Sequence, residues 1–228
     1  MKEFLNRIRS REQTVSVHKQ MLYTLLLALL GVALGTFSKF LDTTASNELP
    51  FLLEYLDIRN FLGRFAFWVV IALCIAVYSS APLRGAVNVF TFFVGMVGSY
   101  YLYSKFIAGF FPRSYALIWV GFTAAAPLLA VLCWYAKGTG KIALMLSAVI
   151  TAVLFNMTFV YGWGYFEPRS VLEAVCFLGG VFALRRQTVK ETALMLLIGI
   201  GIAFLLNAVS RFALGNQKMG CRTDRLKQ

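Results

Sequence analysis

Charged residues are scarce in this 228-residue chain, and histidine is almost absent. Asp, Glu, Lys and Arg make up 14% of the residues, whereas an ordinary soluble domain has about 25%. His18, near the N-terminus, is the only histidine. No HExxH motif occurs, and the four cysteines show neither a CxxC pair nor metal-ligand spacing. These absences argue against most hydrolytic chemistry, so we expect no catalytic residue, no metal site and no cofactor.

Apolar residues are correspondingly abundant. They make up 59% of the chain, and they form charge-free runs close to the roughly 20 residues that a helix needs to cross a bilayer. The runs cover residues 21–38, 65–83, 85–104, 114–136, 142–166 and 192–210, with a shorter one at 174–184. The sequence therefore predicts an all-α, polytopic transmembrane helical bundle with seven or six spans, in which the sixth helix is short.

Basic residues concentrate outside these runs and suggest three parts. We expect a basic interfacial segment over residues 1–20, a transmembrane helical domain over 21–214 and a basic tail over 215–228. The formal net charge is +12, but loops rich in Lys and Arg are typical of membrane proteins, so we assign no nucleic-acid partner. The lipid bilayer is the expected environment, with another membrane protein as a possible partner.

The position of the positive charges also predicts orientation. The basic N-terminus favours a cytoplasmic N-terminus in a plasma membrane protein. With seven crossings the 22 Lys and Arg residues divide evenly between the two sides, and with six crossings most of them lie on the cytoplasmic side. The charge rule thus favours six spans, whereas the lengths of the apolar runs favour seven.

Two capping-box patterns mark where the last helices begin. Ser170 is followed three residues later by Glu173, and Thr188 is followed by Glu191 in the same way. These patterns predict helices that start near Val171 and Val189. The first of them ends before Arg185 and is only about 23 Å long, a little less than a hydrocarbon core of about 30 Å.

Four charged residues are our candidate ligand-binding site. Lys39, Asp42, Arg64 and Glu173 all fall near the outer ends of the expected helices. They would line an outward-facing vestibule roofed by the loop at residues 42–60, whose apolar stretch at 49–58 suggests an interfacial helix or a lid. The simpler alternative is a set of interfacial charges that reach the lipid headgroups.

Amides within the apolar runs are the remaining polar candidates. Asn88, Asn156 and Asn207 would lie at membrane depth, where an asparagine more often bridges helices than contacts a substrate. The Gly31 to Gly35 spacing indicates close helix packing within the chain. Tyrosines and tryptophans at the outer helix ends, Tyr100 and Tyr101 among them, are typical of an aromatic belt. Gly162 and Gly164 are expected to end the fifth helix.

Several blocks of the sequence resemble a known family. They are Ile75 to Phe90, continuing through Gly95 to Tyr103, and Cys133 to Gly138, and they are similar to a family of uncharacterised bacterial multi-pass membrane proteins; Gly35 to Asp42 also looks like that family's first-helix ending. The resemblance covers most of residues 22–184 and implies no function. The architecture also resembles the substrate-binding membrane subunits of energy-coupling-factor transporters, although those generally have six helices.

Three functions follow as hypotheses. The first is a small-molecule transport or solute-binding membrane component with its site at the outer helix ends. The second is an accessory or scaffold protein that binds another membrane protein. The third is a membrane-embedded enzyme, which the absences described above disfavour.

Overall fold

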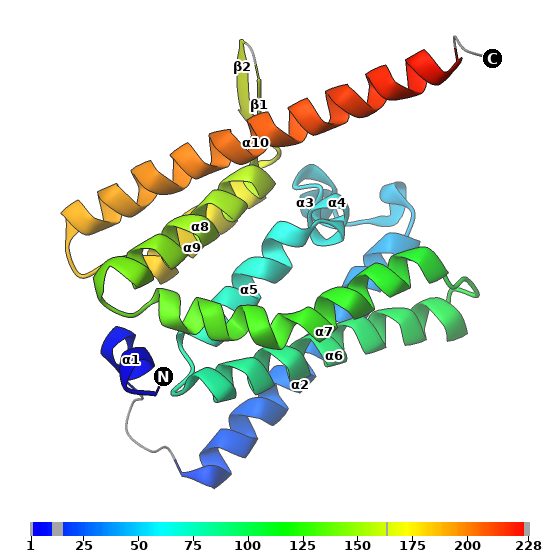
Figure 1. Cartoon of the computed structure of the whole chain (residues 1–228). Coiled ribbons are helices and arrows are strands. Elements are labelled where there is room, and N and C mark those ends of the chain that lie inside the picture. Colours follow the sequence, from blue (N-terminus) through cyan, green and yellow to red (C-terminus); the bar gives the residue numbers. More distant parts are fainter. Residues whose placement is uncertain (1, 11–15, 163, 226–228) are drawn as a thin grey trace.

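The computed structural model describes residues 2–10, 16–162 and 164–225, and it is almost entirely helical (Figure 1). Its elements, in chain order, are α1 (Lys2–Ile8), α2 (Val17–Thr43), the short 3-10 turn η1 (Ser46–Glu48), α3 (Phe51–Tyr55), α4 (Ile58–Gly63), α5 (Phe65–Val77), α6 (Pro82–Phe106), α7 (Arg113–Ala136), α8 (Gly140–Thr158), β1 (Phe159–Gly162), β2 (Tyr165–Pro168), α9 (Val171–Leu184) and α10 (Val189–Arg225).

Five of the helices are long and apolar enough to cross a membrane: α2, α6, α7, α8 and α10 over Val189–Ser210. Each of these helices corresponds to one of the predicted apolar runs. Their outward faces carry many exposed leucines, valines and phenylalanines, as expected where lipid rather than water surrounds the protein. The two remaining runs form the shorter helices α5 and α9, so a count of seven or six spans is not established.

The helices pack as a ring with two outer members. Helices α5, α6, α7, α8 and α9 each contact the next, and α9 contacts α5 to close the ring. Outside the ring, α2 packs on α6 and α10 packs on α8 (Figure 1). We call the end where α5, α7 and α9 begin the loop end, and the end where they finish the turn end. The short helices α3 and α4 cover part of the loop end.

Glycines allow α2 to lie directly against α6. A Cβ atom added at Gly31 would overlap the carbonyl oxygen of Phe92, and one at Gly35 would overlap that of Met96. From the other side, a Cβ at Gly95 would lie 2.6 Å from the carbonyl oxygen of Ala28. Only hydrogen fits at these crossings, so the predicted role of Gly31 and Gly35 in packing within the chain is confirmed.

The expected helix over residues 65–83 is wrong in its length. Helix α5 stops at Val77, after 13 residues, because the next helix begins at Pro82, in its first turn. Proline forces the preceding residue out of the helical conformation, and Ala81 is extended, with φ −152° and ψ 154°. The predicted starts of the last two helices, at Val171 and Val189, are confirmed.

The expected helix over residues 142–166 is also too long. Helix α8 ends at Thr158, and β1 and β2 then pair as an antiparallel hairpin in which Phe159 lies opposite Pro168. Gly162 and Gly164 lie in this hairpin rather than at a helix end, and Gly164 has a φ of +85° that favours glycine. The hairpin projects past α10 at the loop end (Figure 1).

Both predicted basic termini are partly described. Residues 11–15 and 226–228 lie outside the described chain. The helix α1 is the part of the N-terminal segment that precedes this gap, and its Ile8 is buried against the turn between α7 and α8. In the predicted tail, the backbone of α10 continues as a helix through Arg225, and the side chains there are not among those described.

Candidate functional site

A cavity of about 510 Å³ opens at the loop end of the ring. The C-terminal ends of α2, α4 and α6 and the N-terminal ends of α5 and α7 surround it. Its wall combines aromatic rings with two cations and two serines: Ser38, Lys39, Leu62, Gly63, Trp68, Met96, Val97, Tyr100, Tyr101, Phe110, Pro112, Arg113, Ser114, Tyr115 and Trp119. Among the described residues of this lining are two cations and no carboxylate.

The aromatic wall is held in place by specific contacts. The indole of Trp68 is fully buried and donates a hydrogen bond of 2.7 Å to the carbonyl oxygen of Leu62. Trp119 stacks on Phe65, with 4.6 Å between the ring centres. Because these rings are fixed before any ligand arrives, a flat apolar molecule could pack against them at little cost in side-chain ordering.

Lys39 lies in the wall near the C-terminal end of α2 and is almost buried, with 8% of its surface exposed. Its Nζ is 3.8 Å from Oδ2 of Asp42, one helical turn later, and 5.0 Å from the centre of the Tyr100 ring. The hydroxyl of Tyr100 donates to the same Asp42 oxygen. Asp42 thus holds both the ammonium and the phenol at the cavity rim.

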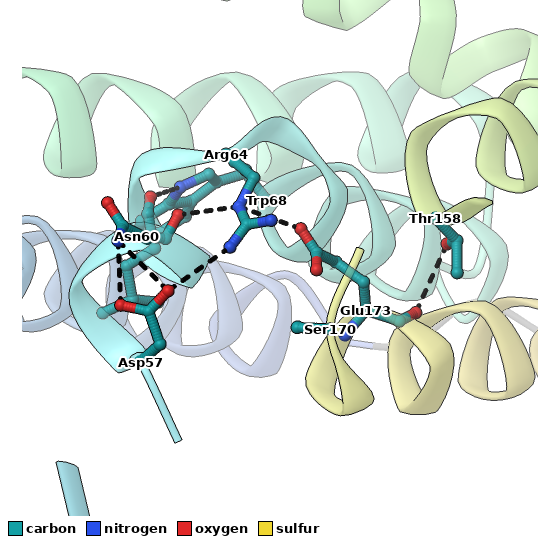
Figure 2. A network of polar contacts seen from close by, with 8 residues as sticks. Asp57, Asn60, Arg64, Trp68, Thr158, Ser170 and Glu173 are labelled. Carbon is teal, nitrogen blue, oxygen red and sulfur yellow. Dashed lines mark hydrogen bonds and ion pairs between the residues drawn. The ribbon is translucent and has the colours of Figure 1, made fainter. Parts of the chain in front are cut away.

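Arg64 and Glu173 form a second pair, which joins the starts of α5 and α9 (Figure 2). The Glu173 side chain is completely buried, and its Oε1 lies 3.0 Å from Nε of Arg64. That Nε donates its hydrogen to the carbonyl oxygen of Asn60 at 3.0 Å. A nearby carboxylate, Asp57, lies 3.8 Å from Nη2 of Arg64 and accepts hydrogen bonds from Asn60.

The local sequence explains how Glu173 reaches this position. Ser170 caps α9, and its hydroxyl accepts a hydrogen bond of 3.4 Å from the backbone N–H of Glu173. In a complete capping box the glutamate side chain would return to the cap residue. Here it turns toward Arg64 instead, at a helix N-terminus whose dipole favours a negative charge.

The four predicted site residues therefore form two pairs, Lys39 with Asp42 and Arg64 with Glu173. Only Lys39 lines the cavity; Arg64 directly follows the lining residue Gly63. Sequence reasoning missed Arg113 and most of the aromatic wall. The tyrosines of α6 were assigned to an aromatic belt, and no sequence pattern shows that α4 and α7 bring further rings to them.

The three intramembrane asparagines lie away from this cavity. Asn88 accepts a hydrogen bond of 2.7 Å from Thr24 of α2. Asn156 accepts a hydrogen bond of 2.6 Å from Tyr161 and donates to the carbonyl oxygen of Ala203 on α10. Both amides thus bridge neighbouring elements, which is the role expected for an asparagine at membrane depth. Asn207 lines a smaller cavity of about 330 Å³ beside the hairpin.

Comparisons of the chain with protein-family models, with curated proteins and with solved structures give no match. The class of the protein rests on its helices: it is a helical membrane protein whose five long apolar helices fit a multi-pass arrangement. Among the described residues, no group of three or more His, Cys, Asp or Glu side chains is placed to hold a metal ion.

Proposed function

We propose that this protein is a solute-binding or transport component of the plasma membrane, and that it binds a small organic anion in the loop-end cavity. The observation that carries the proposal is the cavity wall, which combines Lys39 and Arg113 with several aromatic residues and has no carboxylate among its described residues. Ligand sites commonly combine such apolar walls with a few polar groups that fix orientation.

The size of the cavity supports a small molecule. Ligand pockets typically span roughly 300–1,000 Å³, and this one holds about 510 Å³. The apolar part of the ligand would pack against Trp68 and Trp119. A carboxylate or similar acidic group would accept hydrogen bonds from Lys39 and Arg113, since bonds between charged groups are stronger than neutral ones.

Its position supports access from one side of the membrane. With the N-terminus in the cytoplasm, as the basic residues near it favour, α2 would end at the outer face. The cavity would then open outward beneath the segment of η1, α3 and α4. Binding rather than catalysis is proposed because the described residues of the lining include no histidine or carboxylate to activate a serine as a nucleophile.

A ligand screen with matched variants tests this proposal. The purified full chain would be screened by thermal shift against a panel of small aromatic and aliphatic carboxylates, alcohols and amines. We expect stabilisation by carboxylates that carry an apolar ring. Lys39→Met should weaken binding of such a hit by about tenfold, because a hydrogen bond to a charged group contributes roughly 1.5–3 kcal/mol.

Lys105→Met is the matched control. Lys105 lies four residues after Tyr101, the last α6 residue of the cavity wall; it is exposed and does not line the cavity. Its loss should leave affinity unchanged. Hits confined to amines, or equal losses in both variants, would contradict the proposal. Stoichiometric co-purification with another membrane protein, without any ligand binding, would favour the scaffold hypothesis instead.

A further inference from the structure

The turn end of the ring collects basic side chains around three helix C-termini. The last carbonyls of a helix have no partners within it and carry partial negative charge, so cations are attracted to them. Arg9, which follows α1, reaches two of these helices. Its Nη1 donates hydrogen bonds of 2.9 Å to the carbonyl oxygen of Val77 on α5 and 3.0 Å to that of Trp134 on α7.

Two further cations cap α7 and α9 in a reciprocal way. Lys137, just after α7, donates from Nζ to the carbonyl oxygens of Ala183 at 2.7 Å and Arg185 at 2.8 Å. Arg186, just after α9, donates from Nη1 to the carbonyl oxygen of Ala136 at 3.0 Å. The charges of Lys137 and Arg186 therefore have a structural use in joining the two helix ends.

Arg185 has no such use. Its guanidinium lies 4.2 Å from the centre of the Phe182 ring, and within the described chain its side chain donates no hydrogen bond to protein and forms no ion pair. Arg185 is exposed, and Phe182 is 58% exposed on the outward face of α9. A cation with free donors therefore sits on an apolar ring that faces the surroundings of the helix bundle.

Arg185 belongs to a concentration of positive charge at the turn end, with Lys137, Arg186 and Arg9. Burial, followed by the positive charges of Arg185, Arg186 and Arg9, lowers the pKa of Lys137. Repulsion among these groups would be relieved by a bound anion, and the exposed N–H groups of Arg185 are suited to a phosphate, which guanidinium groups bind in a two-pronged geometry.

We propose that the turn end binds the phosphate headgroup of an anionic phospholipid, with Arg185 as the principal contact and Phe182 against an acyl chain. Two features favour a lipid over a dissolved phosphate. Phe182 offers an apolar surface continuous with the lipid-facing side of α9, and α9 is only 14 residues long, so its end lies close to the hydrocarbon boundary. Basic pockets between helix ends are known to favour such headgroups.

The test measures lipid binding to the purified full chain in a neutral detergent. Native mass spectrometry would titrate dioleoylphosphatidylglycerol and, separately, dioleoylphosphatidylcholine, which has the same acyl chains. We expect tighter binding of the anionic lipid, and we expect Arg185→Gln to weaken it about fivefold, the loss typical of one basic residue near a lipid surface. Because Arg185 contributes only its backbone oxygen to the capping bonds, this variant should keep its thermal stability.

Arg84→Gln is the matched control. Arg84 lies at the same end, in the first turn of α6, and lines a different cavity. The Arg84→Gln protein should bind the anionic lipid with the affinity of the wild type. Equal affinity for the two lipids, an equal loss in Arg84→Gln and Arg185→Gln, or competition by millimolar inorganic phosphate that abolishes lipid binding would each overturn the proposal.

Discussion

At the scale of single residues, the carboxylate of Glu173 is a charged group in a completely buried position. Moving a charge out of water costs several kcal/mol unless a partner offsets it. Arg64 is the cation at 3.0 Å, and neither Glu173 oxygen has a hydrogen-bond partner among the residues that the structure describes. The stability of the helix pair α5 and α9 should therefore depend on Arg64.

Replacing Arg64 by Met tests this dependence. The single variant leaves the Glu173 charge buried and unpaired, so we expect it to lower the free energy of unfolding by about 3 kcal/mol. Changing Glu173 to Met as well should restore most of the loss, because two apolar side chains can replace a buried ion pair. Thermal unfolding in detergent measures both.

The control for this pair is Arg169→Met. Arg169 is exposed, and its contact with Thr158 is made by its backbone N–H. It should change stability by less than about 0.5 kcal/mol. A double variant as unstable as Arg64→Met alone would show that the ion pair is not the reason for the loss.

At the scale of elements, the sequence predicted helix starts better than helix ends. Ser170 and Thr188 predict the starts of α9 and α10 because an N-cap acts through a local hydrogen bond that the sequence itself specifies. The break between α5 and α6 lies just before Pro82, and the hydropathy of a continuous apolar run does not reveal it. The hairpin after α8 could not be read from residues 159–168, because aromatic and β-branched residues suit a membrane helix and a strand equally.

The crossing of α2 and α6 gives a second prediction. Gly35→Ala would place a methyl group against the backbone of Met96, so we expect the helices to separate and stability to fall by roughly 1–3 kcal/mol. The matched change is Gly98→Ala on α6, where an added Cβ meets nothing within 4 Å. That variant should be neutral or slightly stabilising. Thermal unfolding that ranks the two variants equally would contradict the packing account.

The capping lysine at the turn end gives a third prediction, on pH. The pKa of Lys137 is lowered in the folded state, by burial first and then by Arg185, Arg186 and Arg9. Between that lowered pKa and the ordinary value of 10.5, the unfolded chain binds more protons, so stability should rise with pH.

Lys137→Met should lack this contribution. We expect the unfolding temperature of the wild type to rise relative to that of the variant as pH approaches the ordinary lysine value of 10.5 from below. The variant also loses two hydrogen bonds, but their loss shifts its curve by a constant amount. Parallel pH profiles would therefore mean that Lys137 does not titrate as described.

At the scale of the whole molecule, the two ends of the ring differ in chemistry. The loop end holds the aromatic cavity and the ion pairs of Lys39 and Arg64, and the turn end holds the basic cluster. The sequence predicted that charged residues would meet at the outer helix ends, because apolar runs fix which residues share a depth. It could not predict which of them pair, since that depends on the ring order of the helices.

Orientation gives a fourth prediction. The contact of Arg64 with Glu173 joins the starts of α5 and α9, and the contact of Lys137 with Ala183 joins the ends of α7 and α9. The three helices therefore run in the same direction. In a background with its cysteines replaced by serine, a membrane-impermeant maleimide should label Glu48→Cys on intact cells. Lys141→Cys and Gln187→Cys should react only after permeabilisation. Labelling of Gln187→Cys on intact cells would mean that α9 does not cross.

The most direct test of the central claim fills the cavity. Gly63 lines it, and a Cβ added there meets nothing within 4 Å, so Gly63→Leu should occupy ligand space without disturbing the fold. Gly98→Leu adds the same group in open space elsewhere. Isothermal titration with the best carboxylate from the screen should then give at least a tenfold loss of affinity in Gly63→Leu and wild-type affinity in Gly98→Leu. Unchanged affinity in a folded Gly63→Leu protein would contradict the assignment of the cavity as the binding site.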